Sequence, residues 1–125
     1  MSLRIVTWNI NSVRLRVDQV ARFVAEYAPD VLSPDGAVLI VGFGRVGRLV
    51  GELLAEHDQR FIALDAEPAS VRSGRTEGHE VYYGDAARPE MLTACGLESA
   101  RALIVTMDSP TKVDDVVKTA RALRG

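Results

Sequence analysis

The sequence has little cysteine, few aromatic residues and no long apolar run. Cys95 is the one cysteine in 125 residues, so no internal disulfide can form, and a reducing cytoplasmic location is expected. The longest apolar stretch, residues 37–41, is far too short to span a bilayer. Residues 1–4 run directly into a strand-like segment and lack the layout of a signal peptide. We therefore expect a cytoplasmic protein with no membrane segment in this chain.

An excess of charge of one sign is also missing. Lys and Arg number 15 and Asp and Glu number 17, which gives a formal net charge of −2. A nucleic-acid-binding domain usually carries a basic patch or stripe, so no nucleic-acid partner is expected. The length of 125 residues and the hydrophobic content of 47% are ordinary for one globular domain. We therefore expect a single domain over residues 1–125.

What the sequence does contain is an alternation of strand and helix patterns. Five β-branched or apolar segments indicate strands, at residues 4–10, 37–42, 60–65, 80–83 and 102–107. Helical spacing or a helix-starting proline follows each of them, at residues 13–28, from 45 onward, at 68–78, at 89–94 and from about 110. Five such units predict an α/β fold, a three-layer sandwich in which a five-stranded parallel Rossmann-like sheet has helices on both faces.

The handedness of parallel crossovers restricts the order of these strands. The last four strands should take the Rossmann order third-second-first-fourth. The first strand, residues 4–10, must then lie at an edge, and we place it beside the strand at residues 102–107.

The most informative motif is the glycine loop Gly42-Phe43-Gly44-Arg45-Val46-Gly47, which follows a buried strand and opens a helix. Gly42 permits the tight turn, Gly44 lets a phosphate approach the backbone, and Gly47 lets the helix pack close to the strand. The helix N-terminus offers unpaired N–H groups and the positive end of its dipole. The loop therefore predicts a phosphate site to which Arg45 adds charge, with a solvated arginine as the alternative.

Acidic residues follow the next two strands of the predicted sheet. Asp65 closes the strand at residues 60–65, where a carboxylate accepts hydrogen bonds from ribose hydroxyls. Asp85 follows the strand at residues 80–83, and ligands bind outside the carboxyl ends of such strands. Asp85 and Ala86 are therefore expected to line the base or ribose pocket. For the loop and Asp65, a structural glycine turn with a solvated aspartate is the alternative; for Gly84-Asp85, the alternative is a simple turn.

A family resemblance rests on residues 41–47, Leu64-Asp65, Glu67-Pro68, residues 81–86 and residues 102–105. Through them, residues 37 to about 124 resemble the RCK or TrkA-N nucleotide-binding domain that regulates potassium transport, in particular that of Kef-type potassium-efflux systems. The resemblance implies binding of NAD(H) or AMP, with Asp65 at the ribose and Asp85 and Ala86 near the adenosine. It also implies a sensing role rather than catalysis, and it suggests Arg75 for the nucleotide pocket.

The first part of the sequence resembles a different family. Residues 5–14 and 28–32 are similar to the N-terminal βα segment of exonuclease III-type endonuclease/exonuclease/phosphatase enzymes. The asparagine that matches Asn9 helps to organise the metal site of that family, but residues 33–36 replace the segment carrying its glutamate ligand. The family's catalytic His and Asp are absent from this sequence, so no catalytic or metal-binding residue is expected.

The two resemblances together predict a chimera, with a grafted βα unit at residues 1–32, a junction at 33–36 and a nucleotide-binding core at 37–125. The leading interpretation is a non-catalytic adenine-nucleotide-binding module in an engineered or recombined protein. A purely structural chimera is the alternative, and a nuclease fragment or a dehydrogenase ranks below both. We expect His57 and His79 to be solvated. The family's domain usually continues with further strands after the position of residue 124. The sheet edge that this exposes suggests a homodimer as a further expectation.

Overall fold

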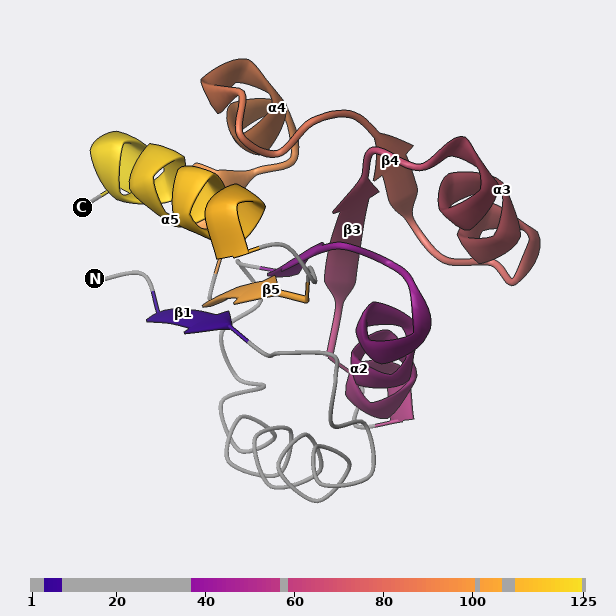
Figure 1. The fold of residues 1–125 in the computed structure, drawn as a ribbon. Helices are drawn as coiled ribbons and strands as arrows, with labels where there is room; N and C mark the ends of the chain where they lie inside the picture. Colours follow the sequence, from indigo (N-terminus) through magenta and orange to yellow (C-terminus); the bar gives the residue numbers. More distant parts are fainter. Residues whose placement is uncertain (1–3, 8–36, 57–58, 101, 107–109, 125) are drawn as a thin grey trace.

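The computed structural model of the chain describes residues 4–7, 37–56, 59–100, 102–106 and 110–124. Strands and helices alternate through this part (Figure 1): β1 (Arg4–Thr7), β2 (Val38–Val41), α2 (Arg45–Glu56), β3 (Phe61–Asp65), α3 (Pro68–Thr76), β4 (Val81–Tyr83), α4 (Pro89–Ala94), the 3-10 helix η3 (Leu97–Ser99), β5 (Ala102–Val105) and α5 (Pro110–Arg124). The predicted helix at residues 13–28 and Asn9 lie outside the described residues.

The strands form one parallel sheet in the order β1-β5-β2-β3-β4. The last four strands thus take the predicted Rossmann order, third-second-first-fourth. β1 adds a fifth strand at the edge beside β5, where Arg4 pairs with Ala102 and Thr7 with Val105. The predicted placement of the first strand is therefore confirmed, although its described part stops at Thr7.

Helices cover both faces of the sheet, which explains why its strands are apolar at successive positions. Because side chains alternate along a strand, Val38 and Ile40 pack with α2 and α3, whereas Leu39 and Val41 pack with α4 and α5. Figure 1 shows α2 and α3 together on one side of the sheet and α4 with α5 on the other. The predicted three-layer arrangement is confirmed for the described residues.

Local chemistry sets several of the element boundaries. Pro68 and Pro89 lie in the first turns of α3 and α4, where the missing N–H costs nothing. Gly96 has a φ of 89° between α4 and η3, a conformation that favours glycine. The strand predicted at residues 102–107 ends earlier, at Val105. Because all strands are parallel, the carboxyl ends of β2, β3, β4 and β5 meet at one edge, where the glycine loop lies.

Candidate functional site

The glycine loop turns sharply at Gly42 and enters α2 at once. Gly42 has a φ of +91°, and its N–H donates to the carbonyl oxygen of Leu64 at 2.8 Å. A Cβ at Gly47 would lie 2.0 Å from the carbonyl oxygen of Gly42, so only glycine allows α2 to start this close to the end of β2. The structural roles predicted for Gly42 and Gly47 are confirmed.

Gly44 is the exposed point of this loop. A Cβ built there would meet no atom within 4 Å, so the structure alone does not require glycine at this position. The carbonyl oxygen of Gly44 accepts the N–H of Arg48 at 3.0 Å, as expected for the residue that precedes α2. The backbone at Gly44 is therefore open to an approaching ligand.

Asp65, at the end of β3, holds the loop in position. Its Oδ2 accepts the backbone N–H of Phe43 at 2.6 Å, and its Oδ1 accepts the N–H of Glu67 at 2.8 Å. The N–H of Phe43 is therefore directed to Asp65, which the motif alone did not reveal. A carboxylate has about four lone-pair sites, so these two bonds leave capacity for hydroxyl groups of a ligand.

A cavity of about 450 Å³ opens where these strands end. This volume lies within the usual range for small-molecule sites. The cavity brings together five of the residues predicted for the site, which are Gly42, Gly44, Asp65, Asp85 and Ala86. Its other lining residues are Val41, Leu64, Ala66, Glu67, Ser70, Gly84, Thr106 and Lys112.

The other loop residues predicted for the site do not line this cavity. The side chains of Phe43 and Val46 belong to the apolar core beneath α2 and α3. The ring of Phe43 stacks on that of Phe61, with ring centroids 5.9 Å apart. Gly47 is buried under the turn at Gly42. These residues therefore anchor the loop, and their side chains do not face a ligand in the cavity.

His79 is not solvated as the sequence suggested. Its ring lies beside the rings of Phe43 and Phe61, with centroid distances of 5.6 and 5.4 Å. Gly78, at a φ of +89°, turns the chain back, and the N–H of His79 donates to the carbonyl oxygen of Gly74 at 3.0 Å. This turn places the imidazole against these two rings with 19% of its side chain exposed, so the prediction of a solvated His79 was wrong. His57 lies outside the described residues.

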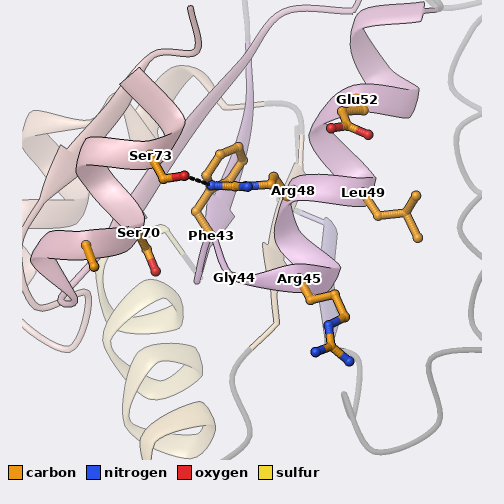
Figure 2. Close-up of a pocket in the computed structure, with 9 residues that line it drawn as sticks. Phe43, Gly44, Arg45, Arg48, Leu49, Glu52, Ser70 and Ser73 are labelled. Carbon is orange, nitrogen blue, oxygen red and sulfur yellow. Dashed lines mark hydrogen bonds between the residues drawn. The ribbon is translucent and has the colours of Figure 1, made fainter. Parts of the chain in front are cut away.

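A second hollow, of about 660 Å³, lies between α2 and α3 and shares Gly44 with the cavity. Arg48 crosses it from α2: its guanidinium donates to Oγ of Ser73 and reaches Oε1 of Glu77 at 3.5 Å. Figure 2 shows Arg48 extended toward Ser73, whereas Arg45 points away from both. Arg45 lines this hollow and not the strand-end cavity, so its predicted contribution to phosphate binding stays a prediction.

The TrkA-N domain family model matches residues 38–125 of the chain. The chain belongs to the TrkA-N domain family. Its structure is similar to the crystal structure of the TrkA-N domain of the inner membrane protein ybaL from Escherichia coli, with 33% identity and a TM-score of 0.65. The match covers 70% of this chain and 65% of that chain. Domains of this family are typically regulatory nucleotide-binding modules of potassium transport.

The resemblance also suggested Arg75 for the nucleotide pocket of this TrkA-N domain. In the structure, its Nε donates to the carbonyl oxygen of Val81 at 2.8 Å and ties α3 to β4. Arg75 lines a separate hollow with Val71 and Tyr83, away from the strand-end cavity. Arg75 is therefore not among the described residues that line the cavity with Asp65, and its role in nucleotide binding stays a prediction.

Thr106 and Lys112 are among the residues that line the cavity of this TrkA-N domain and that the sequence reasoning missed. Thr106 is buried directly after β5, and its hydroxyl lies 2.7 Å from the carbonyl oxygen of Gly42, to which it can donate. A polar residue right after an apolar strand was the available signal. Lys112 lies in the first turn of α5, where the helix dipole disfavours a cation. That unfavourable position is the feature of the sequence that could have drawn attention to Lys112.

The described part of this TrkA-N domain contains neither a metal-binding cluster nor a membrane-spanning helix. No group of three or more His, Cys, Asp or Glu side chains there is arranged to hold a metal ion. None of the helices described is long and apolar enough to cross a membrane. The resemblance of residues 1–32 to exonuclease III-type enzymes stays a prediction, since only Arg4–Thr7 of that segment is described.

Proposed function

We propose that this TrkA-N domain is a non-catalytic, cytoplasmic module that binds NAD(H) or AMP and serves the regulation of potassium transport. One observation carries the proposal: the open backbone of Gly44 and the acids Asp65 and Asp85 line the same cavity at the carboxyl ends of the strands. Open parallel sheets bind nucleotides at this edge. Family membership supports the same function.

The cavity suggests how the nucleotide lies. The phosphate would approach the backbone of Gly44, where no side chain blocks it. The ribose hydroxyls would donate to Asp65, which keeps unused lone pairs beside its bonds to Phe43 and Glu67. Asp85 and Ala86 would contact the adenosine.

Calorimetric titration with NADH, NAD⁺ and AMP tests the proposal, and Gly44→Ala is the best variant for it. The added methyl group meets no protein atom but occupies the space through which a phosphate reaches the backbone. We expect the fold to persist and nucleotide affinity to fall at least about tenfold. Asp65→Ala is a weaker test because it also removes the acceptor that holds the Phe43 N–H.

Two results would speak against the proposal. The first is the absence of heat from any of these nucleotides with a folded wild-type protein, which would favour the purely structural scaffold. The second is unchanged affinity in Gly44→Ala, which would place the ligand elsewhere. Ala69→Ser, on the first turns of α3 and outside the cavity lining, serves as the matched control and should bind as the wild type does.

We also propose that residues 1–36 are a unit grafted onto the TrkA-N core in an engineered or recombined chain. Two findings support this: the family model begins at residue 38, and β1 pairs only with β5, at the outer edge of the sheet. In a chain lacking residues 1–36, we expect nucleotide binding to persist, because the described residues of that segment, Arg4–Thr7, are not among those lining the cavity. A homodimer through an exposed sheet edge would appear as a doubled mass in analytical ultracentrifugation.

A further inference from the structure

A separate hollow of about 480 Å³ lies between α3 and β4, and we call it the edge hollow. Its lining residues come from α3 and from the end of β4, and they are Pro68, Val71, Arg72, Arg75, Thr76 and Tyr83. None of these residues lines the strand-end cavity. Figure 1 shows α3 and β4 at the opposite end of the sheet from β1. The edge hollow is therefore distinct from the site proposed for the nucleotide.

The edge hollow is positively charged. Two of its lining residues are arginines, and no Asp or Glu is among the described residues that line it. Neither Arg72 nor Arg75 forms an ion pair with a described residue. Two arginines and no acid give this surface a formal charge of +2, in a chain whose net charge is −2. Such a surface attracts a negatively charged partner.

The acidic residues that are nearest in sequence contact other parts of the molecule. An Oε atom of Glu77 lies 3.5 Å from the guanidinium of Arg48 on α2. An Oε atom of Glu80 lies 3.4 Å from the guanidinium of Arg60. Glu67 lines the strand-end cavity. The fold therefore directs these carboxylates away from the edge hollow, and they do not compensate its positive charge.

Arg75 is held in place at the edge hollow. Its Nε donates to the carbonyl oxygen of Val81 at 2.8 Å, which fixes the plane of the guanidinium. The terminal nitrogens of a guanidinium carry further N–H donors, and these can form a bidentate contact with a carboxylate. Because one hydrogen bond already orients the side chain, less conformational entropy is lost when a carboxylate binds.

β4 ends the sheet, so one side of its backbone faces no described strand. The carbonyl oxygen of Glu80 and the N–H of Gly84 both bond to β3. Backbone groups alternate in direction along a strand, so Val81 and Tyr83 direct theirs to the outer side. Arg75 already donates to the carbonyl oxygen of Val81. An extended segment can therefore add to the sheet edge beside Tyr83, where the edge hollow lies.

The exposure of the lining residues favours a protein segment over a small molecule. Five of the six are exposed, and Tyr83 is 59% exposed. Small-molecule sites enclose most of the surface of their ligand, which so open a rim does not do. Tyrosine and arginine are enriched at the residues that dominate binding between proteins. Val71, which is buried, supplies an apolar floor for one side chain of the partner.

We propose that the edge hollow is a docking surface for an extended acidic segment of a partner protein. One apolar side chain of the segment lies over Val71 and against the ring of Tyr83. Carboxylates on either side of it pair with Arg72 and Arg75. The docking does not depend on a bound nucleotide, since the edge hollow shares no lining residue with the strand-end cavity.

The test uses the acetylated and amidated peptide Glu-Glu-Phe-Glu-Glu, titrated into the ¹⁵N-labelled full chain at low salt. Amide chemical shifts locate the peptide and give its Kd. We expect shifts centred on α3 and β4 and a Kd below about 1 mM. A peptide with Gln in place of each Glu should bind at least about tenfold more weakly, and so should one with Ala in place of Phe.

Arg72→Gln is the best variant of the protein, because Arg75 also ties α3 to β4. Loss of one exposed ion pair should weaken peptide binding about threefold. Arg121→Gln is the matched control: Arg121 is an exposed arginine on α5, lies outside the edge hollow and gives the same change in net charge. It should leave the Kd unchanged.

Four results would overturn the proposal. The first is no shift at α3 or β4 with about 1 mM peptide and a folded chain. The second is a set of shifts centred on other elements. The third is equal weakening by Arg72→Gln and Arg121→Gln, which would mean attraction by net charge alone. The fourth is equally tight binding of N-acetylphenylalanine, which would make the edge hollow a site for a small carboxylate. None of these results affects the nucleotide titrations.

Discussion

Gly47→Ala tests the contact that sets the glycine loop against the sheet. The new Cβ would lie 2.0 Å from the carbonyl oxygen and 3.0 Å from the carbonyl carbon of Gly42, and 3.1 Å from Oγ1 of Thr106. The distance to the carbonyl oxygen of Gly42 is more than an ångström shorter than an ordinary van der Waals contact. The clashing group is backbone, and Gly42 is held on both sides: its N–H donates to the carbonyl oxygen of Leu64, and its carbonyl oxygen accepts from the hydroxyl of Thr106. The carbonyl therefore cannot yield freely.

The expected magnitude follows from two opposing effects. Overpacking costs typically 1–3 kcal/mol, and a clash with constrained backbone belongs at about the upper end. Alanine gains about 1 kcal/mol over glycine inside a helix. We therefore expect Gly47→Ala to lower the free energy of unfolding by about 2 kcal/mol. For a domain of this size that corresponds to a fall in Tm of roughly 6–10 °C.

Urea titration followed by circular dichroism gives the free energy of unfolding, and thermal melts give Tm. Gly44→Ala is the control, since its Cβ meets no atom within 4 Å, and we expect a change below about 1 kcal/mol. If Gly47→Ala were as stable as the wild type, or less perturbed than Gly44→Ala, then α2 would not begin against the end of β2, and the reasoning on the loop would be refuted.

Further perturbations test two residues beside the glycine loop and two titratable side chains elsewhere in the fold. Thr106→Val removes the hydroxyl donor to the Gly42 carbonyl and should cost about 1 kcal/mol in urea titration, whereas Thr106→Ser should cost less. Asp65→Asn leaves one carbonyl oxygen for the two backbone N–H groups that the carboxylate accepts, and should cost about 1–3 kcal/mol; a neutral result would mean that the loop does not depend on Asp65. Burial raises the pKa of Cys95, so the folded chain retains its thiol proton where the unfolded chain loses it. The free energy of unfolding should therefore be fully retained below the ordinary thiol pKa and fall as pH rises through that range and above, and Cys95→Ala should remove this decline. The hydrogen bond to Glu80 also raises the pKa of Tyr82, so Tyr82 contributes a similar fall in the free energy of unfolding that begins at higher pH. Tyr82→Phe should remove that part of the decline.

Much of the fold was predictable because it depends on local chemistry and on one topological rule. Pro68 and Pro89 mark helix starts through the missing N–H of proline, and residues 38–41 are apolar throughout because helices cover both faces of β2. The right-handed crossover then leaves few possible orders for the strands. The same local reasoning identified Gly42 and Gly47, whose roles depend on neighbours within the motif.

The sequence by itself thus determined the parallel sheet, the order of its strands and the turn of the glycine loop. Tertiary structure alone decided that Asp65 takes the N–H of Phe43, that His79 packs against the rings of Phe43 and Phe61, and that Lys112 lines the same cavity as Asp65 and Asp85. Periodicity reports positions along one element, and it contains no information on which residues of different elements meet. Contacts between different elements depend on where each crossover connection places the next strand. They are therefore fixed only when the whole sheet and its helices have packed.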